Sequence, residues 1–336
     1  MKVLFLCPRF FNYENEISDA LRRAGATVDY FDEKPFNNVF FKIILRLWKN
    51  SNFIRRISDT YFEKILSQAN EQYDYVIVLK GESLDRKSLL KFKEKYKSAK
   101  FIYYAWDSIK NYPHIQEYLN LFDSVFTFDD NDAKAYHYMT HLPLFFSPDF
   151  VNHHQRPSSE GKKPTIAFLG TVHSDRYKLL GEIYQKHKND YNLNFILFFP
   201  SIVVLSGFLV ANIKDVMKYR LCNFTIRSRN KAQIAKFFSD ADAVLDIQHP
   251  RQSGLTMRTI ECLPLKRKFI TTNANVKGYD FYSVNNFYFI DRSDVKIDAS
   301  FFSIPYNDEH AAVIDKYSVD SWVRTLCSVK AEKAEF

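Results

Sequence analysis

Short, continuous apolar runs recur along this chain, and stretches with helical periodicity separate them. Two clear runs are DYVIVLKG at 74–81 and KFIYYAWD at 100–107, with the basic helical pattern 85–99 between them. Strands that are buried on both faces form such continuous runs, and successive parallel strands need a crossover, usually a helix. The alternation therefore predicts an α/β fold with parallel sheets that helices cover.

The same pattern appears on both sides of a polar stretch, which indicates two domains. Residues 151–164 contain Pro, Ser and Gly without an apolar period, as linkers do. We expect Rossmann-like domains at 1–155 and 156–318, and a helix at 319–336 that packs back toward the first domain. The expected strands are 2–7, 27–32, 74–81, 100–107, the start of 124–132, the start of 165–185, 194–199, 243–248, 268–273 and 287–291.

One apolar stretch, 193–213, has about 21 uncharged residues, enough to span a bilayer. Its interior holds Asn194, Pro200 and Gly207, and it lies within the alternation of strands and helices. We therefore predict a strand, a turn and an apolar helix there, with a membrane-docking helix as the intermediate alternative.

Composition indicates which classes of partner the protein binds and in which compartment it occurs. A formal charge of +8 favours an anionic partner, which is a nucleic acid, a lipid surface or a phosphorylated small molecule. No zinc-finger or RNP-type motif occurs, so we expect no nucleic acid. The four cysteines are scattered without a CxxC pair, which is typical of a reducing compartment. The first apolar run is too short for a signal peptide. We expect a cytoplasmic protein, with peripheral binding to the inner face of the membrane as an option.

Residues 248–273, QHPRQSGLTMRTIECLPLKRKFITTN, are typical of a phosphate-binding segment. A strand ends at a turn, and we expect a helix to begin near Leu255. Backbone N–H groups and the helix dipole favour an anion at such a helix start. Gly254 would allow close approach of a phosphate, Thr256 would donate from its hydroxyl, and Arg258 offers a two-pronged donor. Glu261, one turn further, would accept from ribose hydroxyls. The alternative is a capped surface helix whose charged groups face water.

This segment resembles the sugar-nucleotide segment of GT-B glycosyltransferases. In the retaining group with an E-x7-E motif, the second Glu holds the ribose, and Glu261 falls on that position. The first Glu is replaced by Ser253, which departs from the motif at the position next to the donor sugar. The wider pattern H-P-R-Q-S-G-L-T-x-R-x-x-E-C-L, followed by T-T-N, resembles bacterial surface-polysaccharide and CgeB-like glycosyltransferases.

The resemblance implies a GT-B fold, with two Rossmann-like domains whose parallel sheets face each other across a cleft. It implies that the C-terminal domain binds a nucleotide sugar through this segment, with Gln252, Ser253 and Asn273 among the binding residues. His249, at the end of its strand, would contact the sugar or a phosphate, although a single histidine is as readily structural.

A second glycine turn, AFLGTVHSDRYKLL at 167–180, would be a second phosphate cradle. Its candidate residues are Gly170, Thr171, His173 and Arg176. In GT-B enzymes the corresponding loop lies beneath the diphosphate. Arg227 would also reach a diphosphate, although solvated charge is the simpler interpretation.

In the N-terminal domain, the strand 100–107 ends on Asp107. A carboxylate at the carboxyl end of a strand is where an inverting transferase needs a base for the acceptor hydroxyl. Glu82 is the rival base, and capping of the next helix is the alternative role of Asp107. Trp106 and Tyr104 would offer faces for stacking on a sugar.

No motif predicts a metal or a cofactor. Asp130 and Asp132 form a DxD triplet like the metal-binding motif of GT-A enzymes, but we interpret FDDND as a helix cap. We therefore expect metal-independent chemistry, in which the helix dipole and basic groups stabilise the leaving diphosphate.

Two basic amphipathic stretches, 38–58 and 85–100, are candidates for contact with anionic lipid. The alternative for each is a core-packing helix with a solvated basic face.

Together these features predict a metal-independent glycosyltransferase that uses a nucleotide sugar and a lipid-linked or growing bacterial surface glycan. Two alternatives are a nucleotide-sugar epimerase of the same fold and a non-catalytic GT-B-like subunit that binds glycan or a partner enzyme.

Overall fold

The computed structural model describes the chain except for residues 37–51, 152–161, 222, 310 and 329–336. The chain divides into two compact units. Unit 1 contains Met1–Pro143 together with Val319–Phe336, and unit 2 contains Leu144–Ser318. The division falls ahead of the polar stretch in which the sequence placed a linker.

Unit 1 contains a parallel sheet of six strands in the order β2-β1-β3-β4-β5-β6. All five residues of β3 are apolar, and Val76, Ile77 and Val78 are fully buried, as expected for a strand covered on both faces. The strands are β1 (Lys2–Leu6), β2 (Thr27–Phe31), β3 (Tyr75–Leu79), β4 (Lys100–Ala105), β5 (Ser124–Thr127) and β6 (Met139–His141).

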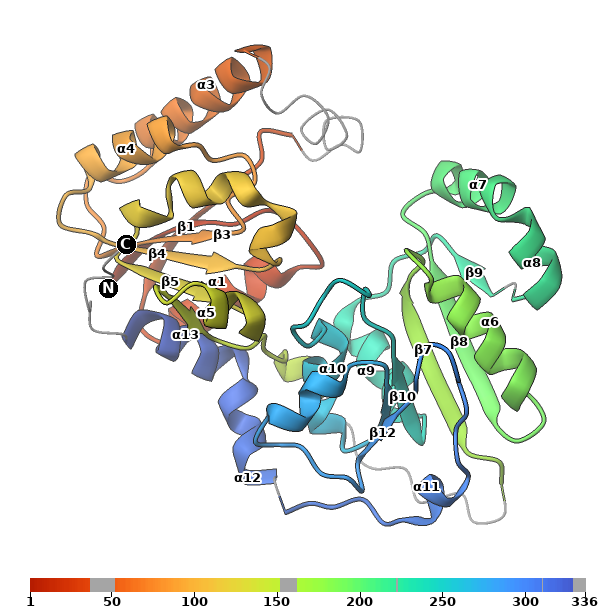
Figure 1. Cartoon of the computed structure of the whole chain (residues 1–336). Coiled ribbons are helices and arrows are strands. Elements are labelled where there is room, and N and C mark those ends of the chain that lie inside the picture. Colours follow the sequence, from red (N-terminus) through yellow and green to blue (C-terminus); the bar gives the residue numbers. More distant parts are fainter. Residues whose placement is uncertain (37–51, 152–161, 222, 310, 329–336) are drawn as a thin grey trace. The chain divides into compact units, whose positions relative to one another are not determined.

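Helices cover both faces of this sheet (Figure 1). One face carries α3 (Asn52–Gln68) and α4 (Arg86–Lys95), whose apolar side chains join the strands in one core. The other face carries α1 (Tyr13–Arg23) and α13 (Val319–Ser328), which pack on each other. The remaining helices are α5 (Asp130–Ala135), η1 (Ile109–Asn111), η2 (Pro113–Glu117) and η3 (Leu119–Leu121).

Unit 2 contains a second parallel sheet of six strands, in the order β12-β11-β10-β7-β8-β9. The strands are β7 (Thr165–Thr171), β8 (Asn192–Phe198), β9 (Phe224–Thr225), β10 (Ala243–Asp246), β11 (Lys268–Thr271) and β12 (Phe287–Phe289). The helices are α6 (Arg176–His187), α7 (Ile202–Ala211), α8 (Ile213–Tyr219), α9 (Lys231–Ser239), α10 (Met257–Glu261), α11 (Ser300–Ser303), α12 (Ala311–Ile314), η4 (Pro148–Phe150), η5 (Leu263–Leu265), η6 (Ala274–Gly278) and η7 (Asp315–Tyr317).

The strand order of each sheet reverses at one point. In unit 2 the chain runs outward from β7 through β8 to β9, then returns to the other side of β7 with β10, β11 and β12. This is the 3-2-1-4-5-6 order of dinucleotide-binding Rossmann sheets. In open α/β sheets, ligands bind outside the carboxyl ends of the strands at such a reversal. The fold therefore directs attention to the loops after β7 and β10, and in unit 1 to those after β1 and β3.

The predicted α/β alternation is confirmed, including the strand, turn and apolar helix within 193–213, which are β8 and α7. Among the residues that the structure describes, no helix is long and apolar enough to cross a membrane. The helix predicted to begin near Leu255 begins instead at Met257. Thr256 has extended backbone angles and accepts from the backbone N–H of Thr259, so it caps the helix.

Candidate functional site

The reversal point of unit 2 brings the two predicted loops together. Arg176, at the start of α6, donates from Nε to the carbonyl of Ile247 (3.0 Å) and from Nη1 to the carbonyl of Thr171 (2.7 Å). It therefore ties the loop after β7 to the loop after β10. Gly170 makes room for this tie, because a Cβ there would lie 3.4 Å from Nη1 of Arg176 and 3.1 Å from the ring of Phe168. Burial lowers the pKa of Arg176 to about 10, so the guanidinium stays charged at neutral pH.

Two histidines meet at the same point. The rings of His173 and His249 lie 5.5 Å apart, one from each loop. Burial, together with the positive charge of Arg176, lowers the pKa of His173 to about 4, so this ring is neutral at pH 7. Nδ1 of His249 accepts from the backbone N–H of Arg251 (3.2 Å). Because Nδ1 accepts, Nε2 is the ring nitrogen of His249 that can donate.

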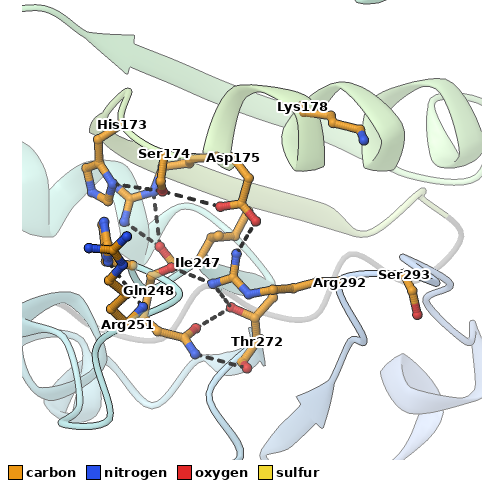
Figure 2. A network of polar contacts seen from close by, with 12 residues as sticks. His173, Ser174, Asp175, Lys178, Ile247, Gln248, Arg251, Thr272, Arg292 and Ser293 are labelled. Carbon is orange, nitrogen blue, oxygen red and sulfur yellow. Dashed lines mark hydrogen bonds and ion pairs between the residues drawn. The ribbon is translucent and has the colours of Figure 1, made fainter.

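Arg292, which the sequence analysis did not select, joins this network from the loop after β12. Its Nη1 pairs with the carboxylate of Asp175 (2.6 Å), and its Nη2 donates to the carbonyl of Gln248 (2.6 Å). Figure 2 shows Arg292 between Asp175, Gln248 and Thr272. The signal was present in the sequence, because Arg292 directly follows the predicted strand 287–291. Carboxyl ends of parallel strands share one edge, so Arg292 comes to the same edge as Arg176 and the two histidines.

A buried carboxylate holds the loop after β10 in place. Asp246, the last residue of β10, accepts from the hydroxyls of Thr256 (2.9 Å) and Thr259 (2.8 Å). Burial raises the pKa of Asp246, while these two hydroxyls and the nearby Arg176 oppose the rise. The hydroxyl proton of Thr256, predicted for a phosphate, is thus directed to Asp246. α10 itself has only five residues.

Asn273 also holds this loop. Its side-chain amide donates to the carbonyls of Ser253 and Gly254 (both 3.2 Å), and Gln252 donates from Nε2 to the carbonyl of Gly254 (3.1 Å). Asn275 adds a third amide contact to the carbonyl of Ser253 (2.9 Å). The structure brings these predicted residues together, with Asn273 and Gln252 shaping the turn from within.

Glu261 lies in a buried charged cluster. Its side chain is only 5% exposed, and its carboxylate lies 3.1 Å from Nη1 of Arg258 and 3.9 Å from Nζ of Lys231. The guanidinium of Arg258 also lies over the ring of Phe238, 4.4 Å from its centroid. Removing the charge of Glu261 would leave both cations, Arg258 and Lys231, without this counter-charge, which is destabilising in a buried cluster.

Arg227 lies apart from these residues. It follows β9, the edge strand, and β8 separates that strand from β7. The side chain is exposed.

In unit 1, both rival bases contact one lysine. Nζ of Lys80 lies 2.8 Å from the carboxylate of Asp107 and 3.2 Å from that of Glu82. Lys34 makes a further ion pair with Glu82 (2.5 Å). Burial acts to raise the pKa of Glu82, but Lys80 and Lys34 outweigh it and lower that pKa to about 2. Asp107 is the more accessible carboxylate, with 37% of its side chain exposed.

The turn that carries Lys80 is strained and tightly held. Lys80 and Gly81 both have φ of 65°, in the left-handed region. Tyr103 donates to the carbonyl of Lys80 (2.6 Å), and Tyr118 donates to that of Gly81 (2.7 Å). Two buried tyrosines thus fix a backbone conformation that costs energy, and such conformations cluster at functional sites.

A buried acid that the sequence analysis missed, Glu33, lies beneath this turn. Its carboxylate accepts from the backbone N–H groups of Glu82 (3.2 Å) and Ser83 (3.1 Å). Burial, followed by repulsion from Glu82, raises the pKa of Glu33 to about 7. Nothing in its sequence context, FDEKP, separates it from surface acids.

Other expectations for unit 1 have different outcomes. Tyr104 and Trp106 are buried, so neither offers a face to a sugar, contrary to expectation. Asp132, and not Asp107, accepts from the backbone N–H of Ile109 (2.8 Å). Asp129 caps α5, in line with the interpretation of FDDND as a cap. Within the described ranges, no group of three His, Cys, Asp or Glu side chains is arranged to hold a metal ion.

The basic residues of α4 have partners within unit 1. Lys87 pairs with Asp59 and Lys91 with Glu63, both across the α3–α4 contact, and Lys95 donates to the carbonyl of Leu66. These contacts occupy much of the basic face that 85–100 was expected to offer to lipid. Of the other candidate stretch, 38–58, residues 38–51 lie outside the described residues.

No family model matches this chain. No curated protein matches it either. Solved structures do resemble it over nearly its whole length. HepE from Anabaena, in complex with UDP and glucose, has a TM-score of 0.63 at 12% identity, covering 98% of this chain and 100% of that one. A glycosyltransferase from Rickettsia africae has a TM-score of 0.61 at 13% identity, covering 96% of each chain. Sucrose-phosphate synthase from Thermosynechococcus elongatus has a TM-score of 0.55 at 11% identity, covering 97% and 92%. The likeness confirms the predicted GT-B fold.

Proposed function

We propose that this chain is a glycosyltransferase that moves a hexose from a nucleotide sugar, bound by unit 2, to an acceptor bound by unit 1. The observation that carries the proposal is the reversal point of the unit 2 sheet. There the strand order places Arg176, Arg292, His173 and His249 at one edge, where α/β sheets bind nucleotides. The structural likeness to HepE, whose crystals contain UDP and glucose, supports the same assignment and makes UDP the first nucleotide to test.

The basic groups at this edge suit a leaving diphosphate. A guanidinium keeps its charge when buried and offers several donors in a fixed plane. Arg176 and Arg292 are held by backbone carbonyls of neighbouring loops, so their charges are pre-positioned before a ligand binds. His249 would donate from Nε2 to a phosphate or sugar oxygen. Under this proposal the diphosphate leaves without a metal ion.

Asp107 is the base that we propose for the acceptor hydroxyl. A general base works best when its pKa lies near the working pH. Glu82, with a pKa of about 2 and two lysine partners, is a weak base. Asp107 is more exposed, and its ion pair with Lys80 would orient it. We expect Asp107→Asn to lower kcat by about 10²–10⁴-fold, while nucleotide binding stays unchanged.

The acceptor that we propose is a lipid-linked or growing bacterial surface glycan, at the cytoplasmic face of the membrane. The support is the sequence pattern of residues 248–273 and the positive formal charge of the chain. This acceptor would be tested after the sugar nucleotide is known.

The deciding experiment is a calorimetric panel of UDP, GDP, CMP and dTDP with EDTA present. We expect one nucleotide to bind without metal, and Glu261→Gln to weaken it at least tenfold if Glu261 holds the ribose, since a lost charged hydrogen bond costs about 1.5–3 kcal/mol. Gln keeps the volume of Glu but removes the counter-charge of Arg258 and Lys231, so the melting temperature of the variant is measured together with its binding. Glu182→Gln, on α6, is the matched control and should bind like the wild type.

Other outcomes would favour other functions. If no nucleotide binds with or without magnesium, a non-catalytic GT-B-like subunit becomes the better interpretation. If a nucleotide sugar is converted to its epimer without any acceptor, the chain is an epimerase. If a nucleotide binds only with magnesium, the proposed metal independence is wrong, and the rest of the proposal stands.

A further inference from the structure

The helix α7 contains only aliphatic, aromatic and small residues, yet none of its ten residues is buried. Val203 is 75% exposed and Val210 is 78% exposed, and Ile202 and Val204 are exposed as well. Soluble proteins seldom leave an apolar group of this kind in water without a binding function.

The inner side of α7 is anchored to unit 2. The ring of Phe208 packs against those of Tyr177 (5.2 Å), Phe199 (5.1 Å) and Phe224 (6.5 Å). Ser201 caps the helix by accepting from the backbone N–H of Val204 (3.3 Å). The helix is therefore held beside β9, as Figure 1 shows, and its outer side is left to solvent.

The next helix in the chain, α8, carries exposed basic residues. On α7, positions 203, 207 and 210 follow helical spacing, and a Cβ on Gly207 would meet nothing within 4 Å. Asn212, with φ of −118° and ψ of 27°, ends α7, and α8 begins at Ile213 as a separate helix. Met217 in α8 is 69% exposed. Lys214, Lys218 and Arg220 are exposed, against one acidic residue in the segment, Asp215. An apolar helix thus leads into a cluster of positive charge.

We propose that α7 and α8 dock unit 2 on an anionic lipid bilayer, lying in the plane of the headgroups. An interfacial helix places its apolar side at the acyl boundary while lysines and arginines contact anionic headgroups. Ten residues of helix extend about 15 Å, half of the hydrocarbon thickness, so α7 lies on a bilayer and does not cross it.

A second copy of the chain is the less suitable occupant. Pairing two copies through this surface would bring Lys214, Lys218 and Arg220 of each against the other, and like charges oppose association. The most exposed side chains of α7 are Val and Ile, whereas protein interfaces rely on Trp, Tyr and Arg for their affinity. A fluid lipid surface needs neither shape complementarity nor aromatic anchors.

Vesicle flotation of the full chain tests this proposal, and it is independent of the proposed function because no nucleotide is added. We expect binding to vesicles of equimolar phosphatidylglycerol and phosphatidylcholine, and much weaker binding to phosphatidylcholine alone. Val203→Ser with Val210→Ser should lower the partition coefficient about tenfold or more, because it removes apolar surface from the acyl boundary. Lys214→Gln with Lys218→Gln should lower it about 30-fold, because each lysine near an anionic surface contributes about 1 kcal/mol.

Matched controls lie elsewhere in unit 2. Val284→Ser changes another valine that is 69% exposed, and Lys236→Gln with Lys277→Gln changes two other exposed lysines. These variants should float like the wild type, and all variants should keep the wild-type melting temperature. Failure of the wild type to bind anionic vesicles would overturn the proposal, as would equal binding by the α7 variant. A dimer in light scattering that the Val203 and Val210 substitutions dissociate, without effect on flotation, would identify a second copy as the occupant and also overturn it.

Discussion

At the scale of single residues, the candidate site of unit 2 depends on side chains that hold loops by their carbonyl groups. Arg176, Arg292 and Asn273 each donate to a backbone carbonyl in the loop after β10. Sequence reasoning selected two of these three as ligands of a nucleotide. It selected these positions because they follow strand ends, but it did not foresee that the loop itself would compete for the same donors.

Arg292 should therefore stabilise the loops of the site in addition to giving the site a positive charge. Arg292→Gln would break the contacts to Asp175 and to the carbonyl of Gln248, and we expect it to lower the free energy of unfolding of unit 2 by about 1.5–3 kcal/mol. Urea denaturation measures this. Arg251→Gln, on an exposed arginine of the same network, is the control and should be nearly neutral. Equal stability of the two variants would contradict a bridging role for Arg292.

His173 should make stability depend on pH. Its pKa is about 4 in the folded chain and near 6.5 when unfolded, so the unfolded state binds more protons between these values. The stabilisation is complete above pH 6.5 and decreases as the pH falls toward 4. We expect His173→Gln to lose less stability than the wild type between pH 7.5 and pH 5, measured by urea denaturation. A wild-type slope in His173→Gln would contradict the assignment.

At the scale of elements, turns decide where side chains point, and here the sequence was least informative. The strand 74–81 was correctly predicted, but the left-handed pair Lys80 and Gly81 was not. Only Gly81 carries a sequence signal for such a conformation, because a lysine adopts it when tertiary contacts enforce it. Those contacts come from Tyr103 and Tyr118, which are distant in sequence.

Gly81 should be much less tolerant of a side chain than a glycine in open space. A Cβ on Gly81 would lie 2.8 Å from Oη of Tyr118, and the residue has positive φ. Gly25 also has positive φ, but a Cβ there would have no atom within 4 Å. Gly25→Ala therefore measures only the cost of a side chain on a backbone with positive φ. We expect Gly81→Ala to destabilise unit 1 by about 1–3 kcal/mol more than Gly25→Ala in thermal denaturation. Equal effects would mean that Tyr118 moves aside freely.

At the scale of the whole molecule, two parallel sheets with different strand orders follow each other in the chain. The sequence predicted the two Rossmann-like sheets because most of their strands are short apolar runs separated by helical patterns. It missed the edge strands β6 and β9, which have three and two residues and no apolar run. Strand order depends on which strands pair, which the local pattern does not encode. The meeting of the loops after β7 and β10, on which the candidate site depends, follows from that order.

The last helix belongs to unit 1, where Leu326 of α13 is fully buried. Leu326→Ala should therefore lower the free energy of unfolding of unit 1 by about 2–5 kcal/mol, through lost burial and a cavity. Unit 2, and any nucleotide that it binds, should be unaffected. Denaturation followed by hydrogen exchange in each unit tests this, with Thr325→Ala, exposed on the same helix, as the control. If Leu326→Ala lowered the protection from hydrogen exchange in unit 2 and not in unit 1, the assignment of α13 to unit 1 would be wrong.

The place of α13 also determines the order in which the protein is completed during synthesis. Domains generally fold as they leave the ribosome, the N-terminal part first. Here unit 2 is fully synthesised while unit 1 still lacks the helix that covers α1, with Trp322 packed on Tyr104. The first sheet to emerge is thus the last to be finished, and a nascent chain that stalls before Val319 carries a complete unit 2 behind an N-terminal sheet with part of its core still open to water.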